Sequence, residues 1–326
     1  MLKKHLRWAQ DLARPTFSLV STFFHIMLKE REAPRQKRKD DKMAIFYNRA
    51  TISFNGQSLN SNQVSGEILE ALTMTKTAIS GSYGIGDNVA YAVSIVNSAA
   101  TAINGLTLTD NLGAYTAGAT TVVPLTYRDG SVIYYIDGVL QPAPTVSGTD
   151  NLVISGINIP AGANATIIYE AIANGYAPLA AGSSITNTAT VTGGGIATPL
   201  TDTATVDVTE EPDLSIAKAI CPAVVTDNGQ LTYTFIIQNT GNTAIIATDN
   251  LTVTDNFDPV LSGIVVTLNG ATIAEGTGYT YDETTGAFAT LPGIVTVDAA
   301  TYVQDPTTGL ITVNPGVSVL TVSGTV

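Results

Sequence analysis

Lysine, aspartate and asparagine residues of this sequence have the types and spacing needed to join side chains through an amide bond. Lys76 is followed by Asp110 and Asn187. A lysine buried among apolar side chains loses its proton more easily, and the neutral amine is a nucleophile. A carboxyl group kept protonated by the same apolar site can polarise the asparagine carbonyl and shuttle protons. The amine then attacks the amide, ammonia leaves, and an isopeptide bond remains.

A second lysine and aspartate repeat this arrangement later in the chain. After residue 43 the chain has only two lysines, and Lys218 of LSIAKAICP aligns with Lys76 of LTMTKTAIS. Asp255 of LTVTDNFD likewise aligns with Asp110 of LTLTDNLG. Surface lysines would be scattered, whereas these two share one position of an internal repeat. No asparagine equivalent to Asn187 follows in the second copy.

Strands must position these residues. From residue 71 onward, short alternating runs of Thr, Val and Ile are separated by Gly, Asn, Asp and Pro, which is typical of antiparallel sandwiches. Together with the repeat, this pattern predicts an all-β chain with two tandem Ig-like β-sandwiches, over residues 71–208 and 209–326. First and last strands of such a sandwich are often neighbours, so Lys76, Asp110 and Asn187 can meet in the core.

The second repeat ends before its last strand. The first continues through SITNTATVT (184–192) and LTDTATVDV (200–208), whereas the second stops at Val326. The segment FYNRATIS (46–53) resembles ITNTATVT (185–192), which places Asn48 over Asn187. We therefore predict that residues 43–70 are an N-terminal donor-strand segment. Its donor residues are Phe46, Tyr47, Asn48, Ala50, Ile52 and Phe54.

An incomplete sandwich exposes an apolar groove and an unpaired strand edge. A strand from another copy can fill it, and because this contact is head-to-tail it propagates into a filament. Lys218, Asp255 and the incoming Asn48 would then lock each joint covalently. Two alternatives stay open: the chain's own N-terminus completes its second domain, or the second repeat is simply shorter and residues 43–70 form an ordinary first hairpin.

Composition argues against most other functions. Residues 1–42 hold 11 of the 15 Lys and Arg residues and 5 of the 27 acidic residues, so the remainder carries 4 − 22 = −18 and is poorly suited to bind nucleic acid. Both histidines also precede residue 43, and Cys221 is the single cysteine, which we expect to be a small buried side chain. We expect no cofactor, no metal, no small-molecule substrate and no enzymatic activity beyond autocatalytic isopeptide formation.

Residues 1–42 differ from the rest in composition and have three interpretations. They are a mis-called start upstream of a true initiation at Met43, an export or membrane-surface leader built on TFSLVSTFFHIML (16–28), or a genuine helix. A basic head and a short apolar run favour the leader, whereas the dense charged segment that follows argues against it.

Several motifs resemble known families. The runs LTMTKTA, GDNVAYAVSIVN, LTLTDNLG and ITNTATV resemble the bacterial conserved repeat domain of unknown function, which occurs in tandem in cell-surface proteins, over residues 71–326. Lys76, Asp110 and Asn187 also resemble the Lys–Asp–Asn set of collagen-adhesin-type Ig-like domains with spontaneous isopeptide bonds. The resemblance implies an Ig-like fold, a surface location and the bond itself. The second repeat departs from it, because it has no asparagine partner.

These observations predict a structural subunit of an extracellular, cell-surface or spore-surface fibre. Its main partner is another copy of itself, with an anchoring or capping protein as a further partner. The alternative functions are a monomeric cell-surface adhesin and a spacer module. For the Lys–Asp–Asn set the alternative is a buried polar network without covalent chemistry. Glu170 is a rival acid for Lys76, but the second repeat has Gly324 at the matching position, which favours Asp110.

Overall fold

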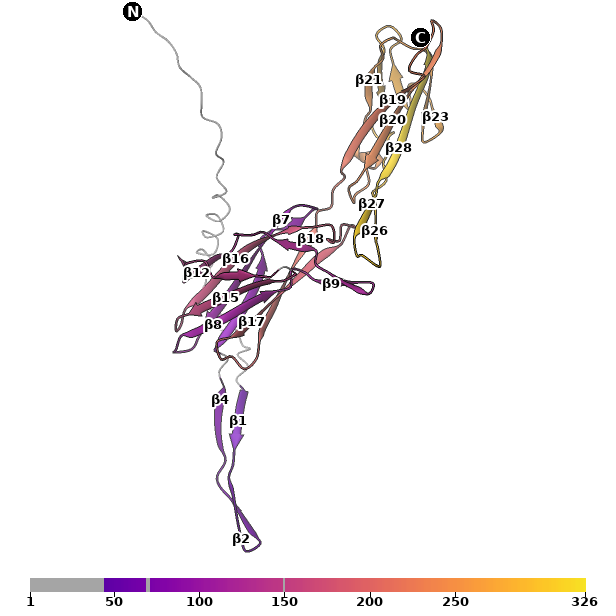
Figure 1. Cartoon of the computed structure of the whole chain (residues 1–326). Helices are drawn as coiled ribbons and strands as arrows, with labels where there is room; N and C mark the ends of the chain where they lie inside the picture. Colours follow the sequence, from indigo (N-terminus) through magenta and orange to yellow (C-terminus); the bar gives the residue numbers. More distant parts are fainter. Residues whose placement is uncertain (1–43, 69–70, 149) are drawn as a thin grey trace, which may run out of the picture. The chain divides into compact units, whose positions relative to one another are not determined.

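The computed structural model describes residues 44–68, 71–148 and 150–326, with the backbone alone described at residues 44–46, 67 and 68 (Figure 1). The interpretations of residues 1–42 concern residues outside this part. The described chain is all-β, and its helical element is the short 3-10 helix η2 (Ala247–Asp249). Within these ranges no helix has the length and apolarity needed to cross a membrane. The chain divides between residues 70 and 71 into two compact units.

Residues 72–208 form the first sandwich, in which two six-stranded sheets pack face to face. Alternation of apolar residues gives each strand one face that packs against the opposite sheet. In strand β16 (Asn164–Ala173), for example, residues alternate between buried and half-buried along the whole strand. One sheet has the order β13 (Val139–Leu140), β12 (Ile133–Ile136), β16, β7 (Asn88–Asn97), β5 (Leu72–Ala78), with β11 (Leu125–Tyr127) also paired to β16. The other has the order β14 (Thr145–Ser147), β15 (Leu152–Ile159), β8 (Ile103–Asp110), β17 (Ser184–Gly193), β18 (Leu200–Val208), β6 (Ser82–Tyr83), and β9 (Tyr115–Ala117) pairs with β10 (Thr120–Val122) in a separate hairpin.

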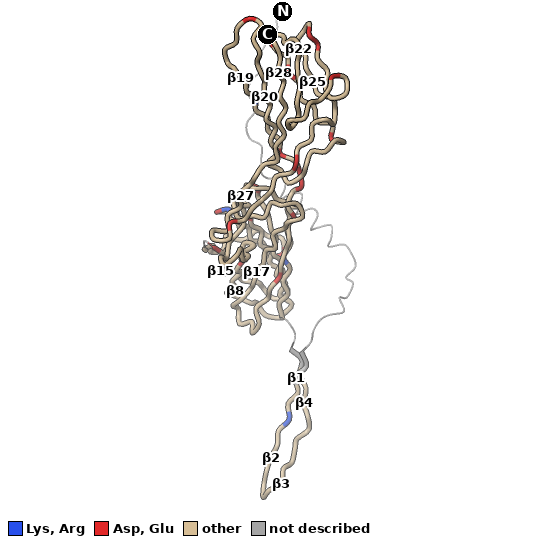
Figure 2. Tube along the Cα trace, turned by 90° about the vertical axis from the view of Figure 1, so that its right-hand side faces the viewer, with Lys and Arg blue, Asp and Glu red and all other residues tan. Residues whose placement is uncertain are grey.

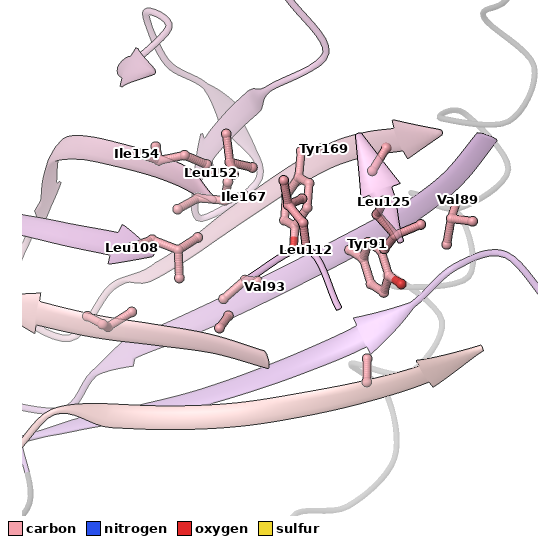
Figure 3. Packing of buried hydrophobic residues seen from close by; sticks show 14 of the residues in the cluster. Val89, Tyr91, Val93, Leu108, Leu112, Leu125, Leu152, Ile154, Ile167 and Tyr169 are labelled. Atoms are coloured by element: carbon pink, nitrogen blue, oxygen red, sulfur yellow. The ribbon is translucent and has the colours of Figure 1, made fainter. Parts of the chain in front are cut away.

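The hairpin β17–β18 closes the first sandwich. Strand β17 pairs with β8, and β18 packs alongside β5 at the edge of the opposite sheet. There the backbone N–H of Lys76 donates a hydrogen bond to Asp202 Oδ2 at 2.7 Å. The inward side chains of the hairpin join a core that runs through both sheets. Figure 3 shows part of this core, with side chains such as Leu108 from one sheet and Tyr169 from the other. Those buried side chains are Ile185, Ala189, Val191, Ala204, Val206 and Val208.

The second sandwich, residues 214–326, has one five-stranded sheet and a smaller three-stranded one. Its own core includes Leu231, Phe235, Phe257 and Leu320. The larger sheet has the order β19 (Leu214–Cys221), β20 (Gln230–Asn239), β28 (Gly316–Thr325), β22 (Ser262–Leu268), β23 (Ala271–Ile273). The smaller has the order β21 (Thr254–Asn256), β25 (Ala287–Thr290), β24 (Tyr279–Tyr281), and β26 (Thr301–Gln304) pairs with β27 (Ile311–Asn314).

The second sandwich lacks its last strand, as the sequence predicts, and the strand beside it is absent too. Strand β8, which carries Asp110, has a neighbour on each side, whereas β21, which carries Asp255, pairs only with β25 among the described strands. Every residue of β19 is exposed, including Ile216 and Ile220, which correspond to inward positions of β5. Among the described strands, none of the second sandwich therefore takes the places that β17 and β18 occupy in the first.

The first unit contributes a long two-stranded ribbon, which we call the N-terminal hairpin (residues 44–68). Strand β1 (Ala44–Asn48) pairs with β4 (Val64–Ile68), and β2 (Thr51–Phe54) pairs with β3 (Gln57–Asn60). The turn between β2 and β3 is Asn55–Gly56, with φ values of 49° and 76°. Asn-Gly is the preferred pair for a two-residue turn of this handedness, because both residues tolerate positive φ.

The N-terminal hairpin has an apolar and a polar side. Ile52 lies opposite Leu59, and these two side chains are 66 % and 67 % exposed. On the other side Thr51 Oγ1 donates to Asn60 Oδ1 at 2.6 Å. A two-stranded hairpin is marginally stable by itself in water. Its exposed apolar side therefore lacks, within the described chain, the core that covers the equivalent side of β17–β18.

A buried asparagine fixes the same loop in both sandwiches. Asn97 Nδ2 donates to the carbonyl oxygens of Thr101 and Pro160, each at 2.9 Å. The aligned Asn239 Nδ2 donates to Thr243 O at 2.7 Å. Both side chains are fully buried, so their hydrogen bonds satisfy loop carbonyls that water does not reach.

We predict that Asn97→Ala lowers the free energy of unfolding of the first sandwich by about 2–4 kcal/mol, because it leaves several buried backbone groups without partners. Urea unfolding of the full chain, followed by hydrogen exchange of peptides from each sandwich, measures the loss. Asn104→Ala is the matched control, since Asn104 is exposed on β8. A comparable loss in both variants would contradict the assigned role.

Candidate functional site

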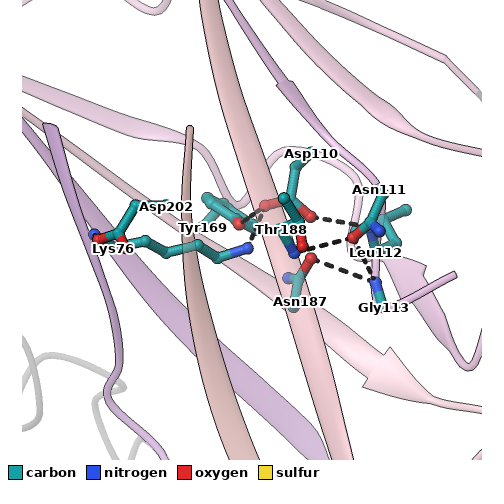
Figure 4. Close-up of polar contacts among 9 residues, drawn as sticks. All are labelled: Lys76, Asp110, Asn111, Leu112, Gly113, Tyr169, Asn187, Thr188 and Asp202. Atoms are coloured by element: carbon teal, nitrogen blue, oxygen red, sulfur yellow. Dashed lines mark hydrogen bonds and ion pairs between the residues drawn. The ribbon is translucent and has the colours of Figure 1, made fainter. Parts of the chain in front are cut away.

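Three strands bring Lys76, Asp110 and Asn187 together inside the first sandwich (Figure 4). Lys76 lies in the middle of β5, Asp110 ends β8, and Asn187 lies in β17. Because Asp110 pairs with Ala189, Asn187 is two residues away on the same face of the sheet. All three residues are buried, and Asp110 and Asn187 are 0 % exposed. The sequence predicted this grouping from the positions of the strands.

Asp110 is the centre of the cluster. Its Oδ2 accepts hydrogen bonds from Lys76 Nζ, at 2.5 Å, and from the hydroxyl of Tyr169. Its Oδ1 accepts the backbone N–H of Leu112 at 2.9 Å. The rival acid Glu170 instead pairs with Arg128 near the surface. Asp110 is therefore the carboxylate that contacts the buried amine.

The amide of Asn187 is held by its oxygen and unpaired at its nitrogen. Oδ1 accepts the backbone N–H of Gly113 at 3.2 Å, whereas Nδ2 is buried and makes no hydrogen bond. Gly113 has a φ of 76°, and a Cβ there would lie 2.5 Å from a methyl carbon of Ile185, so only glycine fits this close approach. A backbone N–H on the carbonyl oxygen is placed where negative charge would develop if an amine attacked Asn187.

Burial changes the acid–base properties of Lys76. Removal from water lowers the pKa of its amine from 10.5 to about 8, although the negative charge and hydrogen bond of Asp110 act in the opposite direction. At neutral pH a much larger fraction of Lys76 is consequently in the uncharged form than for a surface lysine. The pair can exchange one proton over a single short hydrogen bond, which gives a nucleophile and a proton carrier side by side.

Two tyrosines enclose the amine. Lys76 Nζ lies 4.7 Å from the ring centroid of Tyr91 and 6.0 Å from that of Tyr169, and the two rings stack at 5.6 Å. In the internal repeat, GDNVAYAVSIVNSA (86–99) aligns with DNGQLTYTFIIQNTG (227–241), which places Tyr91 over Tyr233. No role was predicted for either tyrosine or for Gly113. The signal for Tyr91 was available, because its recurrence accompanies that of the lysine.

The second sandwich contains a similar but open site. Lys218 Nζ forms an ion pair with Asp255 and lies 4.3 Å from the ring centroid of Tyr233. The side chain of Lys218 is 40 % exposed, whereas that of Lys76 is 0 % exposed. Among the described strands of the second sandwich only β20 pairs with β19, and the Lys218 side chain is correspondingly accessible to water. The structure thus brings two of the three predicted residues together.

The remaining predicted residues lie in the N-terminal hairpin. Asn48 ends β1 and pairs with Val64, while Phe46 pairs with Gly66 through its backbone. The side chain of Phe46 lies outside the described part of the structure. Ala50, Ile52 and Phe54 are exposed, and so is Tyr47, although Tyr47 alternates with Asn48 and belongs to the opposite face.

The expectation that Cys221 is buried is wrong. Cys221 ends β19 and is exposed. The physical reason is strand alternation: Ile220 lies on the inward face opposite Tyr233, so the next residue, Cys221, lies on the outer face of the sheet opposite Thr232.

Comparisons with known proteins give distant matches. The sequence matches no protein-family model and no curated protein, so the resemblance to the conserved repeat domain rests on its motifs. Among solved structures, a 35 kDa C-terminal fragment of the major pilin GBS80 of Streptococcus agalactiae matches with 14 % identity and a TM-score of 0.32, covering 68 % of this chain and 79 % of that one. BcpA, the major pilin subunit of Bacillus cereus, matches with 14 % identity and a TM-score of 0.31, covering 83 % and 73 %. The collagen-binding subdomain ACE19 of Enterococcus faecalis matches with 9 % identity and a TM-score of 0.28, covering 43 % and 98 %. At these TM-scores the alignments are partial, and the functional argument depends on this chain's own geometry.

The two lysine–aspartate pairs should differ in their contribution to stability. These predictions are made in an Asn187→Ala background, in which no Lys76–Asn187 isopeptide bond can form. There we predict that Asp110→Ala lowers the free energy of unfolding of the first sandwich by about 3–5 kcal/mol, because it leaves a buried cation without its partner. Asp255→Ala should cost at most about 1 kcal/mol, since its pair is partly exposed. Urea-dependent hydrogen exchange resolves the two sandwiches within one chain. Equal losses would mean that the first pair is not the buried, unscreened pair described above.

Proposed function

We propose that this chain is a structural subunit of a surface fibre that grows head-to-tail. The N-terminal hairpin of one copy would occupy the uncovered region of the second sandwich of the next copy. One observation carries the proposal: the second sandwich lacks a β17–β18 hairpin, and the same chain carries a hairpin with an exposed apolar side. An unpaired sheet edge and an exposed apolar hairpin face are both unfavourable in water. Docking of the hairpin would pair the backbone groups of the edge and bury the apolar side chains of the hairpin.

The dimensions and faces of the two parts support this pairing. The arms of the N-terminal hairpin, residues 44–54 and 57–68, are at least as long as β17 and β18, which have 10 and 9 residues. Residues Ile52, Leu59 and Val64 are exposed apolar side chains of the hairpin. Burying each would contribute about 1.5–3 kcal/mol. The acceptor offers Ile216 and Ile220 from the inward face of β19.

We infer that isopeptide bonds lock the structure. In the first sandwich the Lys76 amine would attack Asn187 Cγ; the Nζ–Cγ bond forms, the Cγ–Nδ2 bond breaks, and the proton that Nζ loses reaches Nδ2 through Asp110, so that ammonia leaves. At each joint, Lys218 and Asp255 would react in the same way with Asn48 of the incoming copy. The alignment of Asn48 with Asn187 supports this assignment. Such links constrain the unfolded chain as disulfides do, without an oxidising compartment.

Charge is consistent with a fibre of identical copies. Beyond residue 43 the chain has 22 acidic and 4 basic side chains, and the acidic residues are spread over both sandwiches (Figure 2). Such a surface would keep the fibre soluble and limit lateral association of fibres. An anchoring or capping protein would be needed only at the two ends, where one hairpin or one acceptor remains uncovered.

We predict that residues 43–326 form a ladder of multiples on a boiled denaturing gel, and that Asn48→Ala and Lys218→Ala each reduce the ladder to monomer. The reason is that either variant removes one side of the intermolecular bond. Electron micrographs of unboiled samples report non-covalent assembly, so filaments should persist in both variants. Lys76→Ala is the matched control, because it removes a lysine outside the joint and should leave the ladder intact.

Deletion of the N-terminal hairpin separates the fibre from the alternatives. Removal of residues 43–70 should abolish filaments while the first sandwich keeps its hydrogen-exchange protection. Filaments that survive the deletion would contradict hairpin donation. A monomer at every concentration of the undeleted chain would instead indicate that each hairpin completes its own second sandwich, or that the chain is a monomeric adhesin or spacer.

Cross-linking inside the first sandwich should depend on pH in a characteristic way. The Lys76–Asp110 pair needs one shared proton, and it loses that proton above the lowered pKa of Lys76, about 8. Chains recovered unfolded from inclusion bodies and refolded at pH 6–10 should therefore form the Lys76–Asn187 link at a constant rate below pH 8, falling about tenfold per pH unit above it. A rate that rises through pH 8 would mean that the free amine alone limits the reaction.

A further inference from the structure

Two buried polar atoms of the first sandwich have no hydrogen-bond partner, and both belong to residues of the Lys76 cluster. They are the Tyr91 hydroxyl oxygen and Asn187 Nδ2, and within the described residues no other buried side-chain nitrogen or oxygen lacks a partner. Tyr91 is 0 % exposed, so water does not satisfy its hydroxyl. The two groups lie beside each other, and the Asn187 amide acts on the Tyr91 hydroxyl as a weak donor without reaching hydrogen-bond geometry. A buried hydroxyl whose own proton has no acceptor can donate it in a state other than the one observed.

Other buried tyrosines of this sandwich use their hydroxyls. Tyr83 donates to Pro178 O at 2.5 Å, Tyr134 donates to Asn158 O at 2.7 Å, and Tyr169 donates to Asp110. Phenylalanine at position 91 would keep the ring under Lys76 Nζ without burying an unpaired hydroxyl, which is unfavourable. Packing therefore accounts for the ring of Tyr91 but not for its oxygen.

The second sandwich has a tyrosine at the same place. Tyr233 aligns with Tyr91, and its ring lies beneath Lys218 as that of Tyr91 lies beneath Lys76. The other tyrosine of the first site is not repeated: Tyr91 pairs with Tyr169 across the sheet, whereas Tyr233 pairs with Val322. The tyrosine nearer the amine thus recurs with the lysine and aspartate, while Tyr169, whose hydroxyl donates to the aspartate, does not.

We propose that the hydroxyl of Tyr91 donates a hydrogen bond to the departing nitrogen of Asn187 during isopeptide formation, and that Tyr233 does the same for Asn48 at each joint. This inference rests on the proposed function. An amide nitrogen has no free lone pair, which explains why Tyr91 does not donate to it before the reaction. After Nζ attacks Cγ, Nδ2 becomes an amine with a lone pair, and a donor in the pocket can bind it.

The hydrogen bond therefore forms only after the attack, so it lowers the barrier without stabilising the starting amide. Burial and the negative charge of Asp110 keep the pKa of the Tyr91 hydroxyl well above its usual range, although the weak donor contact from the Asn187 amide lowers it. The phenol is consequently protonated, and a donor, at neutral pH. The proton that completes ammonia still comes from Nζ through Asp110, so Tyr91 ends the reaction unchanged.

Refolding of the full chain from the unfolded, unlinked state tests this role. The fraction of Lys76 joined to Asn187 is measured over time as a cross-linked peptide pair by mass spectrometry after proteolysis. Tyr91→Phe should fold with wild-type hydrogen-exchange protection but form the link about ten- to a hundredfold more slowly. Tyr83→Phe is the matched control: it also removes a buried hydroxyl of this sandwich, and it should form the link at the wild-type rate once folded.

The possible results are distinct. Wild-type link formation in Tyr91→Phe overturns the inference and leaves the proposed function intact. No link in the wild-type chain overturns both the inference and the covalent part of the proposed function. Tyr233→Phe gives a second test at the joint, which does not depend on folding of the first sandwich: it should slow the appearance of the covalent ladder while filaments form normally, and an unchanged ladder contradicts the inference.

Discussion

An uncovered sheet edge is the constraint on which the rest of this molecule depends. In the first sandwich the hairpin β17–β18 pairs with β8, packs against β5 and buries the Lys76 cluster. In the second sandwich no described strand takes this place, and every residue of β19 is exposed. Unpaired backbone groups and exposed isoleucines along that edge create a strong requirement for a covering hairpin. On the proposed function, the N-terminal hairpin of another copy would meet this requirement, since its arms are long enough and its apolar side is exposed.

The two lysine sites can be compared as covered and uncovered forms of one arrangement. In both, a lysine amine lies over a tyrosine ring and contacts an aspartate. Covering by β17 brings Asn187 to the first site and removes water, which lowers the pKa of Lys76. The second site has neither the asparagine nor the cover. On the proposed function, arrival of a hairpin would supply both at once, so covalent chemistry at the joint would follow assembly and would not precede it.

The two sandwiches and their lysine–aspartate pairs could be predicted from the sequence because the sequence contains an internal repeat. The alignment of Lys76 with Lys218 and of Asp110 with Asp255 located both pairs. What the sequence could not give depends on three-dimensional contacts. Gly113 approaches Asn187 through a turn with positive φ, and Tyr169 reaches Asp110 from the opposite sheet. Neither contact can be predicted from the spacing of the residues along the chain, because each depends on the three-dimensional packing of the strands and turns.

The exposure of Cys221 has a different cause. Residue type alone favours burial of a cysteine, but strand alternation places Cys221 on the outer face of the sheet, opposite to the face of Ile220. The Asn55–Gly56 turn had a clear local signal, and it converts the predicted donor strand into a two-stranded hairpin. The turn could therefore be predicted from local sequence, whereas the number of strands missing from the second sandwich could be determined only from the order of strands in its sheets.

The most direct test of the account mixes two variants that each lack one side of the joint. Asn48→Ala keeps a working acceptor, and Lys218→Ala keeps a working donor. Each variant alone should run as a monomer on a boiled denaturing gel. Their mixture, after unfolding and joint refolding, should give a covalent dimer, with no higher multiples and with the summed mass reduced by one ammonia. A mixture that remains monomeric would contradict covalent head-to-tail joining of Lys218 to Asn48 of another copy.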